Sequence, residues 1–103
     1  MTAKVKSVYE DLNYANADEM LIKARLVTEI ADQVKRRRLT QTEASELLGF
    51  SQPKLSNLLR GQFRGVSEKK LMECLTRLGR DIEIVVRPAP RSRREGKITV
   101  AVT

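Results

Sequence analysis

The sequence contains no histidine, and its 103 residues include a single cysteine. Histidine is the commonest general base and the commonest metal ligand in proteins, so its absence removes the usual means of acid–base catalysis and of metal binding. No nucleophile is paired with a base, and no residues group as a set of metal ligands. We therefore expect a protein that is not an enzyme and that needs no metal or other cofactor.

Long apolar runs, disulfide partners and stacking aromatics are also missing. No stretch approaches the roughly 20 apolar residues of a membrane span, and no signal peptide is recognisable, so we expect a cytoplasmic protein with no membrane contact. The lone Cys74 stands beside Leu71 and Leu75, which favours a small buried residue over a nucleophile. Two tyrosines and two phenylalanines make no stacking platform for single-stranded RNA.

Positive charge, in contrast, is present in excess. Twenty Lys and Arg against 13 Asp and Glu leave a net charge of +7. This charge suits a polyanion, but it would also suit an acidic protein partner. The length predicts one small domain with a modest core, and such domains often gain stability by dimerising.

The stretch from Leu39 to Gly61 predicts two short helices joined by a tight turn. Thr40 and Glu43 have the spacing of a capping box, in which side chain and backbone cap each other at a helix start. Gly49 follows the last apolar residue of the first helix, where a left-handed residue ends a helix without steric cost. Ser51 then caps the second helix. Two helices joined in this way fit a major groove about 12 Å wide.

The pattern of this stretch resembles the helix-turn-helix of the phage repressor and Cro (Xre) family. The residues that carry the resemblance are Leu39, Gln41, Ala44, Leu48, Gly49, Ser51, Gln52, Leu55, Ser56, Leu58 and Gly61. ADEMLIKARL before the motif and LGRDIEIVVRP after it resemble the HigA-type antitoxins of toxin–antitoxin operons. The resemblance implies a dimeric repressor of a double-stranded DNA operator that also neutralises a toxin protein. The alternative is a free-standing Xre-type regulator without a toxin partner.

The resemblance also implies roles for individual residues. Gln52 matches the position that reads a base, and a glutamine amide can bond adenine bidentately. The other candidate base readers project from the same exposed face of the second helix: Lys54, Ser56 and Asn57. Gln41 matches the position that touches phosphate and buttresses the base reader. The remaining candidate phosphate contacts are Ser51, Arg37, Arg38, Arg60 and Arg64. For the arginines at 37 and 38, a favourable solvated helix terminus is the competing interpretation.

Residues 1–16 form a separate N-terminal segment in our interpretation, either flexible or partner-binding. Asn16 can cap the next helix, which we expect to run to about Arg38. The segment carries apolar residues at helical spacing: Val8, Tyr9 and Leu12. They would either dock on a toxin or cover the helices of residues 17–80, the expected DNA-binding domain.

Residues 81–103 change the apolar period from 3.6 to 2, which indicates β-structure. Ile82, Ile84 and Val86 share one face of a predicted strand, and residues 97–102 alternate in the same way. The two segments could close as a hairpin, or either could pair with its copy across a dimer. We therefore predict a mainly α-helical, repressor-like bundle of four to five helices, followed by a C-terminal strand or hairpin that dimerises.

Overall fold

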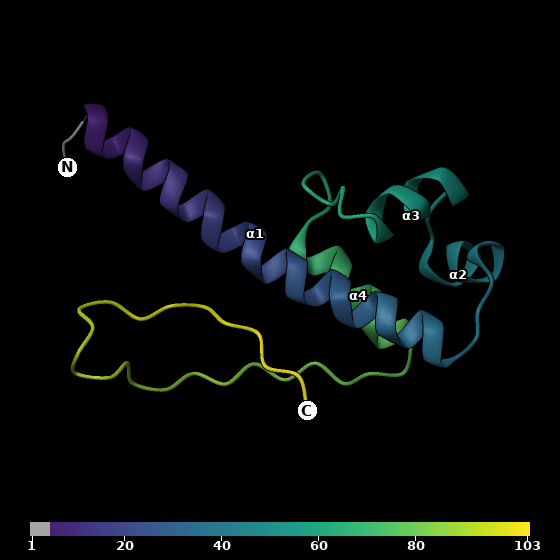
Figure 1. The fold of residues 1–103 in the computed structure, drawn as a ribbon. Coiled ribbons are helices and arrows are strands. Elements are labelled where there is room, and N and C mark those ends of the chain that lie inside the picture. Colours follow the sequence, from purple (N-terminus) through teal and green to yellow (C-terminus); the bar gives the residue numbers. More distant parts are fainter. Residues whose placement is uncertain (1–4) are drawn as a thin grey trace.

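The computed structural model describes the backbone of residues 5–103 and the side chains of residues 17–103. The described part of the chain contains four helices, with a long first helix that extends past the other three and an irregular C-terminal tail (residues 79–103) beneath them (Figure 1). The helices are α1 (Val5–Arg36), α2 (Gln41–Leu48), α3 (Gln52–Leu59) and α4 (Glu68–Arg77). The predicted helical bundle is therefore present.

The core lies where α1 packs along α4 and where α2 and α3 close one end of that pair (Figure 1). Every helix contributes at least one fully buried side chain: Ile30, Leu48, Leu55, Leu58, Leu71 and Cys74. Burial raises the pKa of the Cys74 thiol, and the nearby positive charges of Lys70 and Arg77 offset only part of that shift. The interpretation of Cys74 as a buried apolar residue is confirmed.

Helix α1 differs from the prediction at both ends. It passes through Asn16 without a break, so Asn16 lies inside the helix and does not cap it. The reason is that no glycine or proline occurs between Val5 and Arg36, and nothing in the local sequence ends the helix. The N-terminal part of α1 therefore extends beyond the other helices (Figure 1). The candidate toxin contacts Val8, Tyr9 and Leu12 lie outside the residues whose side chains are described.

The C-terminal end of α1 stops two residues before the predicted limit. Arg38 takes a left-handed backbone with φ 55°, and it is the only non-glycine residue with positive φ in the described part of the chain. The Leu39 amide then donates to the carbonyl of Val34 over 3.1 Å, which closes the helix end. This turn directs the chain into α2.

The prediction of C-terminal strands is wrong for the single chain. Residues 81–87 and 97–103 run out and back as an open loop, and no strand forms in the part of the tail that the structure describes (Figure 1). A strand needs a neighbour to pair its backbone groups, and the two segments of the tail do not supply this to each other. The side chains of Ile84 and Val86 are consequently 79% and 91% exposed.

The end of the tail is nevertheless tied back to the helices. Arg25 donates to the carbonyl of Val100 over 3.3 Å, and Arg80 donates to the carbonyl of Thr103 over 3.1 Å. Val100 is partly buried against the core. The tail thus leaves the bundle after α4 and returns to it at its last residues.

Candidate nucleic-acid interface

The α2–turn–α3 unit has the local geometry that the sequence predicts. The Thr40 hydroxyl accepts from the Glu43 amide over 3.0 Å, while the Glu43 carboxylate accepts from the Thr40 amide over 2.8 Å. Gly49 ends α2 with φ 77°, in the left-handed region that favours glycine. The Ser51 hydroxyl accepts from the backbone amide three residues further on, over 3.3 Å. These bonds satisfy helix-end groups that would otherwise lack partners, and they fix where α2 and α3 begin and where α2 ends.

Two leucines decide which face of α3 is available. Leu55 and Leu58 are fully buried, so α3 turns its opposite side to solvent. Phe50 is partly buried beneath the turn, and the ammonium group of Lys70 lies 5.1 Å from the centre of its ring. The buried leucines and Phe50 therefore hold the exposed N-terminal end of α3 in place.

The four candidate base readers are not equally accessible. Gln52 and Lys54 are exposed at the start of α3, whereas Ser56 and Asn57 are half-buried further along it. The Asn57 side-chain oxygen also accepts from the Arg60 guanidinium over 2.7 Å. The first turn of α3 is thus the part of this helix that is most open to a ligand.

Gln52 is held by a neighbour that sequence reasoning missed. Its side-chain nitrogen Nε2 donates to the Thr42 hydroxyl over 3.1 Å. The resemblance assigns the support of Gln52 to Gln41, whereas the hydrogen bond to the Gln52 side chain comes from Thr42, the next residue along α2. No sequence signal marked Thr42, because the two residues are ten positions apart and meet only through the angle between the helices.

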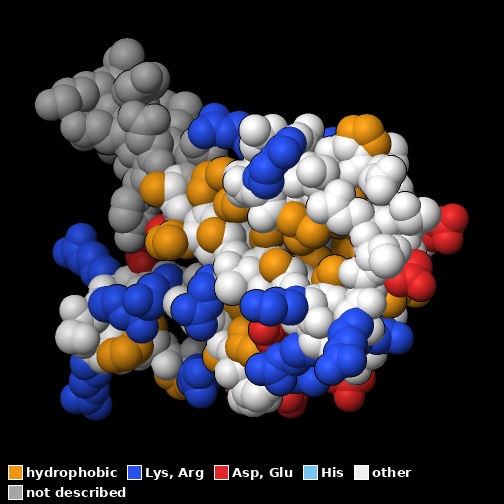
Figure 2. Space-filling view, turned by 45° about the vertical axis from the view of Figure 1, so that its right-hand side comes forward, with side chains coloured by type: hydrophobic (Ala, Val, Ile, Leu, Met, Phe, Trp, Pro, Cys, Tyr) orange, Lys and Arg blue, Asp and Glu red, His pale blue; other side chains and the backbone are white. Residues whose placement is uncertain are grey.

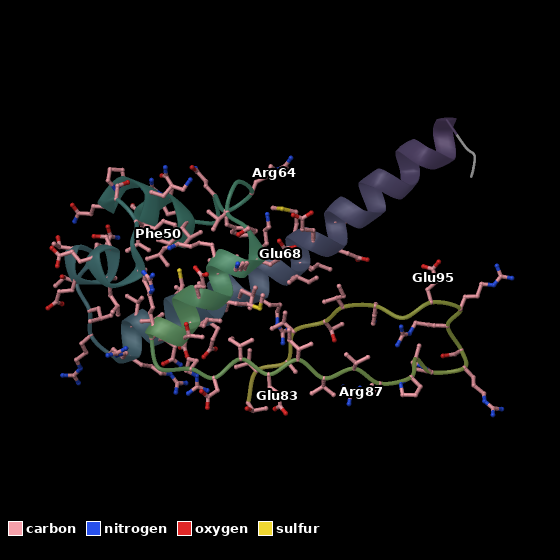
Figure 3. All side chains as sticks on the ribbon, turned by 180° about the vertical axis from the view of Figure 1, so that it is seen from behind. Phe50, Arg64, Glu68, Glu83, Arg87 and Glu95 are labelled. Atoms are coloured by element: carbon pink, nitrogen blue, oxygen red, sulfur yellow. The ribbon has the colours of Figure 1, made fainter. Side chains whose placement is uncertain are left out.

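Five of the six candidate phosphate contacts lie at the two ends of the unit, and Ser51 lies at the turn between the two helices. All six side chains are exposed: Arg37, Arg38, Gln41, Ser51, Arg60 and Arg64. The arginines at 37 and 38 precede α2, and those at 60 and 64 follow α3. Figure 3 shows Arg64 on the α3 side of the molecule, pointing away from the helices, whereas Glu83, Arg87 and Glu95 lie on the tail at the opposite side.

Positive charge is not confined to α3. Figure 2 shows Lys and Arg side chains spread across one face of the molecule and predominating over Asp and Glu. Along the chain, Lys and Arg gather at residues 35–38, where α1 ends, and in the tail (residues 79–103). An excess of positive charge over a surface attracts polyanions without regard to their sequence.

A buried lysine anchors the loop that carries Arg64. The Lys23 ammonium donates to the Arg64 carbonyl over 2.9 Å and lies 3.1 Å from a carboxylate oxygen of Glu19. Its side chain is only 5% exposed. Val66 is buried beneath this loop and Phe63 is half-buried. Sequence reasoning missed Lys23, because a lysine on α1 gives no sign of a partner 41 residues away.

The described residues contain no group of three or more metal-ligating side chains. Among the described helices, none is both long enough and apolar enough to cross a membrane.

The left-handed residue at the end of α1 leads to a prediction about stability. We expect Arg38→Gly to raise the free energy of unfolding by about 0.5–1 kcal/mol, because glycine adopts a positive φ without the steric cost that arginine bears there. Thermal unfolding followed by circular dichroism measures the change.

Arg37→Gly is the matched control for this prediction. It removes the same charge from the adjacent position, where φ is not positive. It should therefore lower the melting temperature, since glycine only adds freedom to the unfolded chain there. If both variants lowered the melting temperature equally, the backbone at Arg38 would not be strained.

Known proteins resemble this chain over most of its length. A family model described as a helix-turn-helix domain matches residues 8–87. A solved structure of a protein whose name assigns it to the XRE family of transcriptional regulators is 39% identical, with a TM-score of 0.78. That match covers 84% of this chain and 98% of the other. No curated protein matches the sequence.

Proposed function

Because this chain belongs to the XRE-type helix-turn-helix family, we propose that it is a sequence-specific repressor that binds double-stranded DNA. The observation that carries the proposal is the exposed first turn of α3, which is capped at Ser51 and supported from beneath by buried leucines. In this geometry the N-terminal residues of the second helix reach base edges in the major groove. The protein then acts in the cytoplasm as a binding protein and has no catalytic role.

The proposal assigns two kinds of contact. Gln52 and Lys54 read base edges most directly, and Ser56 and Asn57 line the remainder of the reading face. Six exposed side chains, at the ends of the unit and at its turn, contact phosphate: Arg37, Arg38, Gln41, Ser51, Arg60 and Arg64. Phosphate contacts position the protein on the duplex and supply most of the affinity, whereas base contacts supply the sequence preference.

The test begins with a randomised library of DNA duplexes, from which the purified protein selects its own site. We expect one enriched sequence with two-fold symmetry, and repression of a reporter gene that carries this sequence in its promoter. Affinity for the site should fall with salt at a slope of about −0.9 per neutralised phosphate. A library without any enriched sequence would contradict the proposal.

We propose further that the protein acts as a dimer. Its tail leaves Ile82, Ile84 and Val86 38%, 79% and 91% exposed, and a second copy of the chain would remove these apolar side chains from water. A two-fold dimer would also present two α3 helices to half-sites about 34 Å apart.

The final part of the proposal is an antitoxin role, which rests on the resemblance of residues 17–26 and 78–88 to HigA-type antitoxins. The proposed toxin contacts are Val8, Tyr9 and Leu12, in the N-terminal part of α1. Because this part of the helix extends beyond the bundle, a partner protein could reach it without touching α3 (Figure 1).

A truncated chain that starts at Ala17 tests the antitoxin role. We expect it to keep the melting temperature and the operator affinity of the full chain, because the bundle and α3 are intact. It should fail to co-purify with, or to neutralise, a toxin encoded beside its gene. The full chain with Val8, Tyr9 and Leu12 replaced by serine serves as the point-variant control and should fail in the same way.

Two outcomes would count against this role. If the truncated chain unfolded at a much lower temperature, residues 5–16 would be part of the folded core. If no toxin were encoded nearby, or if the truncated chain still neutralised it, the free-standing regulator would be the better description.

A further inference from the structure

The side-chain hydrogen bond between Thr42 and Gln52 joins the first turn of α2 to the first turn of α3. Gln52 Nε2 donates and Thr42 Oγ1 accepts, over 3.1 Å. In the described part of the chain, it is the only hydrogen bond between a side chain of α2 and a side chain of α3. Both side chains are exposed, so the pair lies at the surface that the proposed function turns toward DNA.

The bond removes one of the two donors of the Gln52 amide. A glutamine side chain carries two N–H donors and one oxygen acceptor. With one N–H directed at Thr42, the groups left for a ligand are one N–H and the oxygen Oε1. The amide is planar, and both its bond to Cγ and the N–H held by Thr42 lie in that plane, so together they set the directions of the other N–H and of the oxygen.

This remaining pair of groups distinguishes the two purines. In the major groove, adenine presents an acceptor at N7 and a donor at N6, which match one N–H and one oxygen. Guanine presents acceptors at both N7 and O6, and a glutamine would need both N–H groups to satisfy them. A Gln52 that is held by Thr42 can therefore serve adenine fully but guanine only in part.

We propose that Thr42 is a positioning residue that makes Gln52 prefer adenine over guanine at one base pair of the operator. The inference rests on the proposed function, in which Gln52 reads a base. Thr42 is itself well placed for this role, because the capping box of Thr40 and Glu43 fixes the turn in which it lies. Its carbonyl also accepts from the buried Ser45 hydroxyl over 2.9 Å.

A structural tie between the helices is the competing explanation for the bond. The α2–α3 pair is already held by the buried side chains of Leu48 and Leu55 and by the Gly49 turn. Loss of one exposed hydrogen bond, at the lower end of the range for such bonds, should therefore change the melting temperature by about 2–4 °C. If the bond only ties the helices together, its loss should also not change the adenine-over-guanine preference at one base pair while leaving the other base pairs unchanged.

The experiment uses the full chain and the duplex site that it selects from a randomised library. Each A·T pair of the site is changed in turn to G·C, and the adenine-over-guanine affinity ratio is measured for the wild type and for Gln52→Ala. The position at which Gln52→Ala loses the ratio is the one that Gln52 reads. If no position responds, Gln52 does not read a base, and both that assignment and this inference are overturned.

Thr42→Val then tests the inference at that position, since valine replaces the hydroxyl with a methyl group of similar shape. We expect the adenine-over-guanine ratio there to fall about three- to tenfold, with most of the change a gain for guanine. The other positions and the salt dependence should be unaltered. Thr42→Ser, which keeps the hydroxyl, should retain the wild-type ratio.

A double variant completes the test. Adding Thr42→Val to Gln52→Ala should cause no further change in the ratio, because Thr42 acts only through Gln52. If Gln52→Ala removed the ratio while Thr42→Val left it intact, the inference would be overturned and base reading by Gln52 would stand. A Thr42→Val effect spread equally over all positions would likewise overturn it and indicate a structural tie.

Discussion

Gln52→Ala is expected to abolish the preference of the protein for its operator while leaving the fold intact. The side chain is exposed, and its one hydrogen bond is to another exposed residue, so the core is untouched. The loss of a bidentate base contact removes about 1–3 kcal/mol of discrimination for each protomer. For the two protomers of a dimer this amounts to about 2–6 kcal/mol, or about 30- to 25,000-fold in the ratio of operator to random-DNA affinity. Fluorescence anisotropy with the two duplexes measures this ratio.

Arg37→Ala is the matched control, because it removes an exposed residue assigned to phosphate and not to a base. It should weaken binding to operator and random DNA alike, and it should reduce the salt slope by about 1 per protomer. If Gln52→Ala left the affinity ratio unchanged, or if Arg37→Ala changed it as strongly, the division into base and phosphate contacts would be wrong.

Ile84→Lys is expected to convert the protein to a monomer and to lower operator affinity by two to four orders of magnitude. Two linked half-site contacts gain about 10²–10⁴ in affinity over a single one, and a monomer forfeits that gain. A lysine in the middle of the proposed interface would have to bury its charge between two copies, which is costly without a partner. Light scattering reports the mass, and the anisotropy assay reports the affinity.

Leu21→Lys controls for the introduction of a lysine on an exposed apolar position. Leu21 lies on α1 and is 65% exposed, compared with 79% for Ile84. Neither change should alter the helical circular dichroism, since neither side chain belongs to the core. A dimer that persisted in Ile84→Lys, or one that was lost equally in Leu21→Lys, would place the interface away from residues 82–86.

The helix-turn-helix itself could be predicted because its signals are local. The capping box of Thr40 and Glu43, the left-handed Gly49 and the Ser51 cap each depend on residues within a few positions of one another. The leucine spacing of α3 likewise determines which side is buried. The same kind of signal misplaced the start of α1. Asn16 can cap a helix but does not have to, and an uninterrupted run of helix-forming residues continues through it.

Contacts between distant residues could not be predicted in the same way. The predicted C-terminal strands need a partner for their backbone N–H and C=O groups. Alternating apolar residues such as Ile82 and Ile84 have the spacing of a strand, but this spacing does not show which segment would be the partner. The bond from Lys23 to the carbonyl of Arg64 joins positions 41 residues apart. It exists only because the loop after α3 folds back onto α1.

The amino-acid sequence by itself therefore determined that this protein contains a capped pair of short helices with an exposed Gln52, since those features follow from hydrogen bonds and apolar spacing along a single stretch. Tertiary structure alone decided which neighbour holds Gln52, how the loop of Arg64 is anchored, and that the apolar side chains of residues 82–86 stay exposed in one chain. Each of these depends on the angle at which separate elements meet, and that angle is set by packing of the whole core.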